Sequence, residues 1–520
     1  MKNHKTILLF AAFQMVFILS VSAQKRSAVF DEYANNPSAS ILPDFSYTGY
    51  HHGEIGIPDI KARIFDVTTF GATPNDEQSD KVAIEKAITA ATKNGGGIVF
   101  FPNGRFLINE DEDDPEPIKI NCSNIVFRGS GPGNNGTELF MKNKLEADDP
   151  NKMWTTPAMI QFTTNEKNSR IGKIISPAIK SSFEIKIDNT NGIKSGDWVM
   201  LEMLSTDPTL LKYEIGDLKT DDTWTSILNK GVHIKVVHQV KSVQNSIITL
   251  VSPIIYPIDP KHNWELSKYA NNTEVGIEGI AFVGNWKQKF VHHGSATDDS
   301  GWSLIQFAKT TNSWIRNCRF TDVNIALQVS GGANLSVLNC VINGNPGHEA
   351  IYNGGGTNVF FGKLVDESGM WHSFGVNGFA TNTVLYKVTY PANTCFESHS
   401  SQPRNTLLDC VTGGLSMGRA GGALQNMPNH LSGLIFWNYK QTNDAITNFD
   451  FWPTVDKTQW WRMPYPVIVG YHGANTSFIK SHLKYSESLG KPVTPPSLYE
   501  AQLELRLQQL PDWLKKLKLN

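Results

Sequence analysis

A short pattern that returns every 22 to 26 residues between residues 271 and 440 constrains the fold of this chain more than any other feature. Its clearest copies are WIRNCRF (314–320) and SVLNCVI (336–342), and turns rich in asparagine and glycine separate the copies. One apolar position anchors each copy: Cys318, Cys340, Leu364, Val388, Cys410 and Phe436. Leucine-rich repeats have a similar length, but their leucine spacing is absent. The pattern therefore predicts a parallel β-helix, in which each coil stacks on the next at about 4.8 Å.

The rest of the chain divides around this repeat. Lys2 and Lys5, an apolar stretch and the small residues up to Ala23 predict a signal peptide over 1–23, and so an exported protein, periplasmic or secreted. We expect five further regions: an irregular N-terminal segment (24–60), the β-helix start with a capping helix (61–148), a strand-rich elaboration (149–270), the main coils (271–480) and a tail (481–520).

The tail carries its own helix signal. Ser497 and Glu500 have the spacing of a capping box, and Leu503, Leu507 and Leu510 recur on one helical stripe. We expect a C-terminal amphipathic helix that docks on the body.

Charge and cysteine content exclude several classes. Lys+Arg (47) and Asp+Glu (49) nearly balance, so no basic footprint for nucleic acid exists, and no stretch after residue 23 reaches the ~18 apolar residues of a membrane span. The five cysteines are an odd number without a CxxC or tight Cys/His pattern, which argues against zinc and a dense disulfide framework. We expect free thiols, with Cys318, Cys340 and Cys410 in one inward column.

A column of ionisable residues follows the anchors. Eight or nine residues after successive anchors stand His348, His372, Glu397 and Arg419, and His399 comes two residues after Glu397. In a parallel stack such groups would lie roughly 5 Å apart, and histidine can serve as acid or base near neutral pH. We expect this column to be catalytic. A solvated polar ladder, or hydrogen bonding within turns, remains the structural alternative.

Other residues are candidates for substrate binding. Arg404 and Arg419 could hold a carboxylate or sulfate bidentately, Trp371 could stack on a sugar, and Tyr352 is a reserve acid. The insertion 292–302 could fold over the same face as a lid or subsite with His292, His293, Asp299 and Trp302. Metal binding by His292, His293 and Asp299 is the less favoured interpretation, so no metal site or cofactor is predicted.

Six segments carry a family resemblance. The segments 65–72 (FDVTTFGA), 95–102 (GGGIVFFP) and 124–131 (NIVFRGSG), with the helix around Ile84, resemble the opening of pectate-lyase-like right-handed β-helix proteins. The segments 292–319 and 497–502 are similar to an exported bacterial subgroup tied to polysaccharide utilisation, close to the oligosaccharide dehydratase and lyase proteins of ulvan degradation. The resemblance implies carbohydrate substrates, usually acidic, and either elimination or hydrolysis. The aspartate cluster of calcium-dependent pectate lyases is not found, so calcium is unsupported.

We therefore expect an all-β, right-handed single-stranded parallel β-helix with an N-terminal capping helix and a C-terminal amphipathic helix. The leading function is β-elimination on a uronic-acid-containing poly- or oligosaccharide, by a lyase or a dehydratase. Arg419 or Arg404 would hold the carboxylate, and His348, His372 and His399 are the candidate base and acid. One alternative is a glycoside hydrolase that draws its carboxylates from Glu349, Asp366, Glu367 and Glu397. The other is a non-catalytic glycan-binding β-helix.

Overall fold

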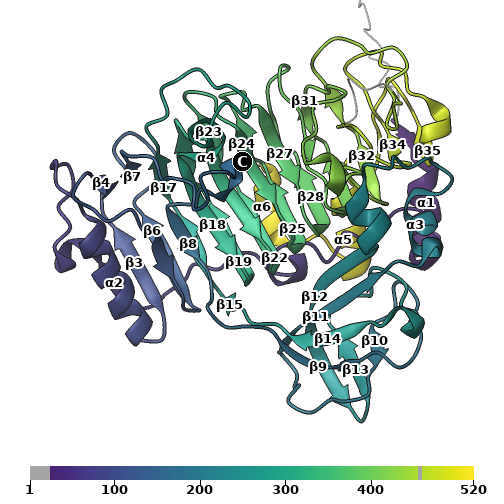
Figure 1. Cartoon of the computed structure of the whole chain (residues 1–520), viewed down its shortest axis with the longest axis horizontal. Helices are drawn as coiled ribbons and strands as arrows, with labels where there is room; N and C mark the ends of the chain where they lie inside the picture. Colours follow the sequence, from purple (N-terminus) through teal and green to yellow (C-terminus); the bar gives the residue numbers. More distant parts are fainter. Residues whose placement is uncertain (1–23, 455–459, 520) are drawn as a thin grey trace, which may run out of the picture.

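The computed structural model describes residues 24–454 and 460–519, so the predicted signal peptide lies outside the described residues. Three parallel sheets run along the molecule, and most of the middle coils add one strand to each of them (Figure 1). The predicted all-β parallel β-helix is confirmed.

The first sheet is the longest. Its path is β2 (Ile64–Asp66), β3 (Gly97–Phe101), β6 (Ile125–Gly129), β16 (Gly276–Glu278), β19 (Thr310–Arg316), β22 (Ala333–Leu338), β25 (Thr357–Gly362), β28 (Thr381–Tyr386), β30 (Arg404–Asp409), β32 (Leu434–Trp437), β34 (Val467–Val469) and β35 (Tyr485–Glu487), with β15 (Asn272–Thr273) beside β19.

The other two sheets complete the coils. The second contains β4 (Gly104–Asn109), β7 (Thr137–Met141), β17 (Ile280–Val283), β20 (Arg319–Thr321), β23 (Val341–Asn343) and β26 (Val365–Asp366). The third contains β5 (Ile118–Ile120), β8 (Ile160–Phe162), β18 (Ser303–Ala308), β21 (Ile325–Ser330), β24 (Glu349–Asn353), β27 (His372–Val376) and β29 (Glu397–Ser398).

Two columns of left-handed residues run along the first sheet, one within the beginning of its strands and one directly after their ends. One is an asparagine ladder of five rungs: Asn312, Asn334, Asn358, Asn382 and Asn405, all with φ between 44° and 57°. Asparagine tolerates this conformation better than most residues, which explains its recurrence at these corners. The second column lies five residues later in each of these coils: Asn317, Asn339, Lys363, Lys387 and Cys410.

The second column corrects the predicted cysteine core. Cys318 and Cys340 are buried in the core as expected, but Cys410 occupies the left-handed corner with φ 57°, and its Sγ donates to the Pro496 carbonyl at 2.9 Å. Val411 fills the inward position instead. The sequence analysis placed the inward anchor of this coil one residue too early, because a cysteine stands at the corner where the neighbouring coils have lysine or asparagine. All five cysteines are unpaired.

The elaboration folds as a separate sheet. Its antiparallel strands run in the order β10 (Glu184–Lys186), β13 (Ile247–Leu250), β12 (Val232–Gln244), β11 (Trp198–Ser205), β14 (Glu265–Lys268) and β9 (Ser169–Lys173). It projects from the lower side of the stack in Figure 1, next to α3 (Pro208–Ile215). The stack itself continues beneath it, because β8 pairs directly with β18.

Helices cover one end and the outer face of the first sheet. The predicted capping helix is α2 (Lys81–Lys93), which buries Ile84, Ala87 and Ile88. The segment 24–60, expected to be irregular, contains α1 (Ala28–Asn35). Ser497 caps α5 (Leu498–Leu507) by accepting from the Glu500 amide at 3.0 Å, as the capping box predicted.

The C-terminal helix stripe divides between two helices. Leu503 is fully buried on the first sheet's outer face, whereas Leu507 and Leu510 are partly buried there. Gln508 takes a left-handed conformation (φ 61°) that ends α5, and α6 (Asp512–Leu519) follows. Within the described residues, no helix is long and apolar enough to cross a membrane.

Candidate active site

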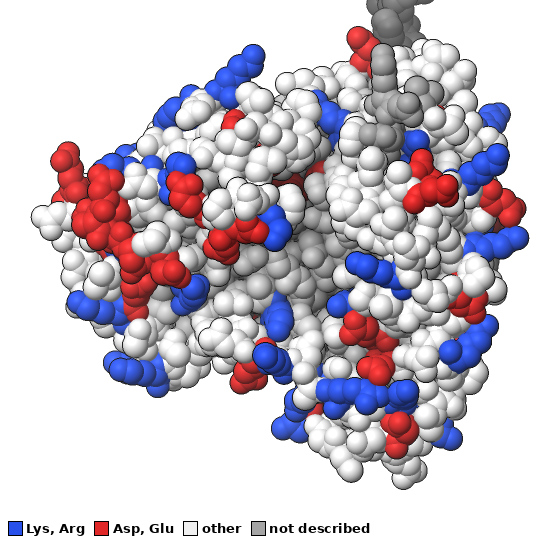
Figure 2. Space-filling model, viewed as in Figure 1, with Lys and Arg blue, Asp and Glu red and all other residues white. Residues whose placement is uncertain are grey.

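Ionisable and aromatic side chains gather on the outer face of the third sheet, around β24, β27 and β29. His348 immediately precedes β24, and His372 and Glu397 open β27 and β29. The insertion, with α4 (Ala296–Ser300), contributes His292 to the same cluster. Figure 2 shows this side of the molecule hollowed over its middle coils, with acidic side chains at the upper end of the hollow.

The predicted column is brought together, but not by the register that the sequence count implied. His348 and His372 are neighbours, since the His372 amide donates to the His348 carbonyl at 2.8 Å. Glu397 pairs with Gly375, three residues beyond His372. Its side chain turns back, so that Glu397 Oε1 lies 3.5 Å from His372 Nε2.

Glu397 and His399 form a hydrogen-bonded dyad. His399 Nδ1 lies 2.6 Å from Glu397 Oε1, and the His399 side chain is 30% exposed while Glu397 is buried. Burial acts against the charge on Glu397, but the imidazoles of His372, His399 and His348 outweigh it and lower the pKa of this carboxyl. Burial also acts to lower the pKa of His399, and the Glu397 carboxylate outweighs it, so the net pKa of His399 is raised. The dyad holds an imidazole of enhanced basicity at the surface of the hollow.

Glu349 completes the acidic part of the site. Burial, together with the charge of Glu397 and a hydrogen bond to it, raises the pKa of Glu349 well above its usual value. The two side chains approach each other over Gly375, and the raised pKa of Glu349 favours its protonated form. Gly375 makes room for this approach, since a Cβ there would lie 3.3 Å from Glu349 Oε1.

Tyr352 stands across Gly375 from Glu397. The register places Tyr352, Gly375 and Glu397 on adjacent strands at one level of the sheet. Burial, followed by the charges of Glu349 and Glu397, raises the pKa of the Tyr352 phenol well above its usual value. The phenol is therefore protonated, the form in which it can donate to a leaving oxygen.

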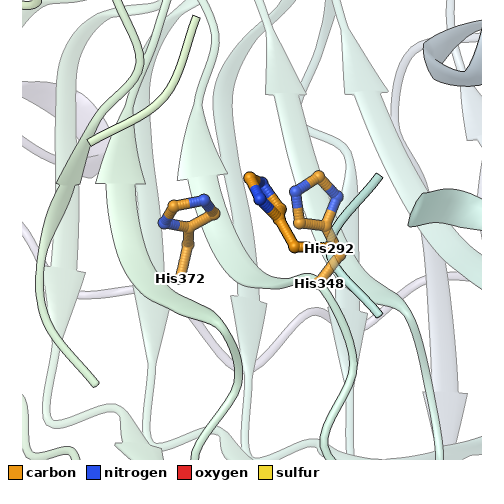
Figure 3. A group of neighbouring side chains, drawn as sticks. All are labelled: His292, His348 and His372. Carbon is orange, nitrogen blue, oxygen red and sulfur yellow. The ribbon is translucent and has the colours of Figure 1, made fainter. Parts of the chain in front are cut away.

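Three histidines share one space above the strands (Figure 3). The ring centroids of His292, His348 and His372 form a nearly equilateral triangle with sides of 5.5, 5.6 and 5.6 Å. His348 Nδ1 lies 3.1 Å from the Asp299 carbonyl oxygen. Burial lowers the pKa of His292 to about 4 and also lowers the pKa values of His348 and His372, which favours the neutral form of each ring.

The insertion is held in place by Asp299. Its Oδ2 lies 2.8 Å from His293 Nδ1 and its Oδ1 accepts from the His293 amide at 3.0 Å, so His293 serves to order the insertion. Trp302, a predicted substrate-stacking residue, is only 9% exposed and packs against Trp286 at 6.0 Å. Its indole therefore supports the insertion from below.

Arg419 and Trp371 form the aromatic wall. The Arg419 guanidinium carbon lies 4.1 Å from the centroid of the Trp371 ring, which stacks on His292 at 5.0 Å. Sequence reasoning missed Phe290, which stacks on His348 at 5.7 Å. Its place two residues before His292 was the available signal.

Arg404 corrects the prediction of a second carboxylate-binding arginine. It is 3% exposed, and its Nε donates to Glu214 Oε1 at 2.6 Å at the junction with the elaboration. The remaining carboxylates of the proposed hydrolytic pool lie elsewhere. Asp366 accepts four hydrogen bonds within its own turn, and Glu367 is exposed beside it.

Two family models match the chain. Residues 64–349, just over half of the chain, match the family described as rhamnogalacturonase A/epimerase, pectate lyase-like. Residues 369–517 match a family described as a domain of unknown function (DUF4955).

Curated relatives match over a short region. The chain is 35% identical over 69 residues to alginate lyase 7 and, over a stretch of the same length, to mannuronan C5-epimerase AlgE3, both from Azotobacter vinelandii. These stretches are 13% of this chain, but only 8% and 4% of the two relatives. The chain thus matches less than a tenth of the length of either relative.

Solved structures resemble the chain at low identity. The tailspike gp49 of Pseudomonas phage LKA1 is 13% identical, with a TM-score of 0.48, over 80% of this chain and 72% of that one. The A-module of the Azotobacter vinelandii mannuronan C-5 epimerase AlgE4 is 12% identical, with a TM-score of 0.37, over 83% and 96%. An exopolygalacturonase from Thermotoga maritima is 12% identical, with a TM-score of 0.30, over 84% and 90%.

Proposed function

The chain belongs to the rhamnogalacturonase A/epimerase, pectate lyase-like family, and we propose that it is an exported enzyme that performs β-elimination on uronate-containing poly- or oligosaccharides. Export rests on the signal peptide predicted over 1–23. The acidic carbohydrate substrate is supported by the family and by the names of the two curated relatives, an alginate lyase and a mannuronan epimerase.

The close approach of Glu349 to Glu397 carries the choice of elimination over hydrolysis. Glycoside hydrolysis uses two carboxyl groups about 5–5.5 Å apart when configuration is retained and about 6.5–9.5 Å apart when it is inverted. Here the Glu349 and Glu397 side chains approach each other over Gly375, and the pKa of Glu349 is raised, which favours keeping a proton on it. We therefore take these two carboxyls to be too close together to flank a glycosidic bond, and assign the base and the acid to the imidazole of His399 and the phenol of Tyr352.

The site residues divide the work of the reaction as follows. His399, held by Glu397, takes the proton from C5 of the uronate, and Arg419 holds the carboxylate onto which the negative charge spreads. The electron pair of the C5–H bond forms the C4–C5 double bond as the C4–O bond breaks. Tyr352 gives its proton to the departing oxygen. The products are a 4,5-unsaturated uronate and either a sugar hydroxyl or a water molecule, and a proton returned from His399 to Tyr352 resets the site.

The test is to incubate the purified protein with acidic polysaccharides and with the oligosaccharides that other lyases release from them. Elimination produces ultraviolet absorbance from the conjugated uronate. Mass spectrometry then separates chain cleavage from loss of one water at unchanged chain length, which identify a lyase and a dehydratase respectively. New reducing ends without absorbance would identify a hydrolase, and binding without any product would identify a glycan-binding module. Either result would overturn the proposal.

Two conservative variants test the roles. His399→Gln and Tyr352→Phe should each lower turnover by about 10²–10⁴-fold, the usual contribution of a general base or acid. Tyr485→Phe, at the far end of the first sheet, is the matched control and should keep full turnover. Full turnover in both site variants would contradict the assignment.

A further inference from the structure

We infer that His292, His348 and His372 together form a binding site for one divalent transition-metal ion of the Zn²⁺ class, with an open coordination position toward the hollow. The inference rests on the proposed function only for the role of the ion, because the site itself is argued from geometry.

The arrangement of ligand atoms is the first support. One ring nitrogen from each histidine lies within 4.8 Å of the corresponding atoms of the other two. Zn–N bonds of about 2.0–2.1 Å at tetrahedral angles require a separation of about 3.3 Å. The ligand nitrogens therefore need to move only slightly closer together. A small shift of His292 can achieve this, since its side chain is half-buried on the insertion while His348 and His372 are fixed beside strands.

The hydrogen-bond state of the rings is the second support. Among the described residues, neither ring nitrogen of the buried His372 has a hydrogen-bond partner, and His348 Nε2 has none either. Leaving such buried polar atoms unpaired costs about 1–3 kcal/mol each. Each of these two rings therefore keeps an unpaired acceptor nitrogen, and an ion that accepts one lone pair from each removes that part of the cost; the other nitrogen of His372 carries the ring proton.

The surroundings match those of metal-binding histidines. A ligating imidazole usually donates its second N–H to a carbonyl or carboxylate, which fixes the tautomer. His348 Nδ1 lies 3.1 Å from the Asp299 carbonyl, which leaves Nε2 free to bind an ion. Glu397 Oε1, 3.5 Å from His372 Nε2, places a negative charge beside the site. Phe290 and Trp371 line it with apolar rings.

The ligand set selects the ion. Three neutral imidazoles suit Zn²⁺, Cu²⁺, Ni²⁺ or Co²⁺, whereas Ca²⁺ and Mg²⁺ require oxygen ligands. Three protein ligands and an open fourth position are typical of catalytic rather than structural zinc sites. In the proposed reaction the open position would take an oxygen of the substrate carboxylate and, with Arg419, withdraw charge from it as C5 loses its proton.

The experiment measures metal binding without any substrate. The full mature chain is dialysed against a chelator and titrated with ZnCl₂ by calorimetry, and with CoCl₂ by visible absorbance. We expect one equivalent of Zn²⁺ to bind and Co²⁺ to give the intense blue absorption of a tetrahedral site. His292→Ala and His348→Ala should abolish both signals while the metal-free variants keep the melting temperature of the metal-free parent. His472→Ala, a histidine that follows β34, should bind as the parent does.

The possible outcomes separate this inference from the proposed function. No binding of Zn²⁺ or Co²⁺ by the parent, or unchanged binding by His292→Ala, would overturn the metal site and leave elimination to be judged by its products. Metal binding that depends on the three histidines, without elimination on any acidic glycan, would sustain the site and overturn the function. CaCl₂ is included as a negative control, and tighter binding of Ca²⁺ than of Zn²⁺ would also overturn the inference.

Discussion

Replacing Arg404 by alanine should unfold this protein more easily without affecting how it binds substrate. The guanidinium joins the coil stack to the elaboration through several hydrogen bonds. It donates to Glu214 Oε1 at 2.6 Å, to the His233 carbonyl at 3.0 Å and to the Gln402 carbonyl at 3.0 Å. The side chains of Arg404 and Glu214 are 4% and 0% exposed. The variant therefore leaves a buried carboxylate and two carbonyl groups without their donor.

The expected loss of unfolding free energy follows from these lost hydrogen bonds. Removing one partner of a buried ion pair costs about 3–5 kcal/mol, because the remaining charge stays desolvated. Glu214 keeps only Ser432, whose hydroxyl and amide donate to Oε2 at 2.7 and 3.2 Å, so little of the loss is recovered locally. The double variant Arg404→Leu/Glu214→Leu removes both charges and should regain at least half of the lost stability.

Urea denaturation followed by tryptophan fluorescence measures these changes. Arg419→Ala is the matched control: this arginine is half-buried and donates a hydrogen bond to the Asn393 carbonyl, so its loss should change the free energy of unfolding by less than about 1 kcal/mol. A loss below about 1 kcal/mol in Arg404→Ala, or a double variant as unstable as the single one, would refute the reasoning.

Three further predictions concern stability and redox state. Burial lowers the pKa of His430 to about 4 from its usual 6.5, so the unfolded chain alone binds this proton between those values; this histidine should contribute about 3 kcal/mol to the fall in the free energy of unfolding as pH drops through that window, so the fall should be smaller by about that amount in His430→Gln, as read from urea midpoints at stepped pH. Leu503→Ala should cost about 2–5 kcal/mol in the same assay, whereas Leu505→Ala, at a position 37% exposed, should cost under about 1 kcal/mol. Thiol titration of the denatured, unreduced protein should find all five cysteines free, and a result of three or fewer would contradict the structure.

The architecture could be predicted from the sequence because a solenoid repeats its local rules. Each coil presents the same apolar anchors and the same asparagine corner, so one correct copy indicates the rest. The error at Cys410 came from reading residue type without backbone conformation. A cysteine in a left-handed corner resembles a core cysteine in sequence, and only its φ of 57° separates the two.

The sequence predicted which residues belong to the candidate site better than it predicted how they are arranged. An offset of eight or nine residues from each anchor found His348, His372, Glu397 and Arg419, because loops that leave equivalent corners reach the same face. The offset could not reveal that Glu397 turns back toward His372, nor that Gly375 admits the Glu349 carboxyl. Arg404 misled for a different reason: the sequence of one coil carries no sign that Glu214, 190 residues earlier, will cover it.

The constant five-residue distance between the two left-handed columns keeps successive coils aligned with one another. Five successive coils keep it although their total lengths differ, so every difference in length is absorbed in the remaining segments, including those that lead into β24, β27 and β29. Insertions in these segments lengthen the loops beside the hollow and leave the alignment of the other coils unchanged. The loops around the reacting groups can therefore change in sequence and length one at a time, while the strands that align those groups keep their positions.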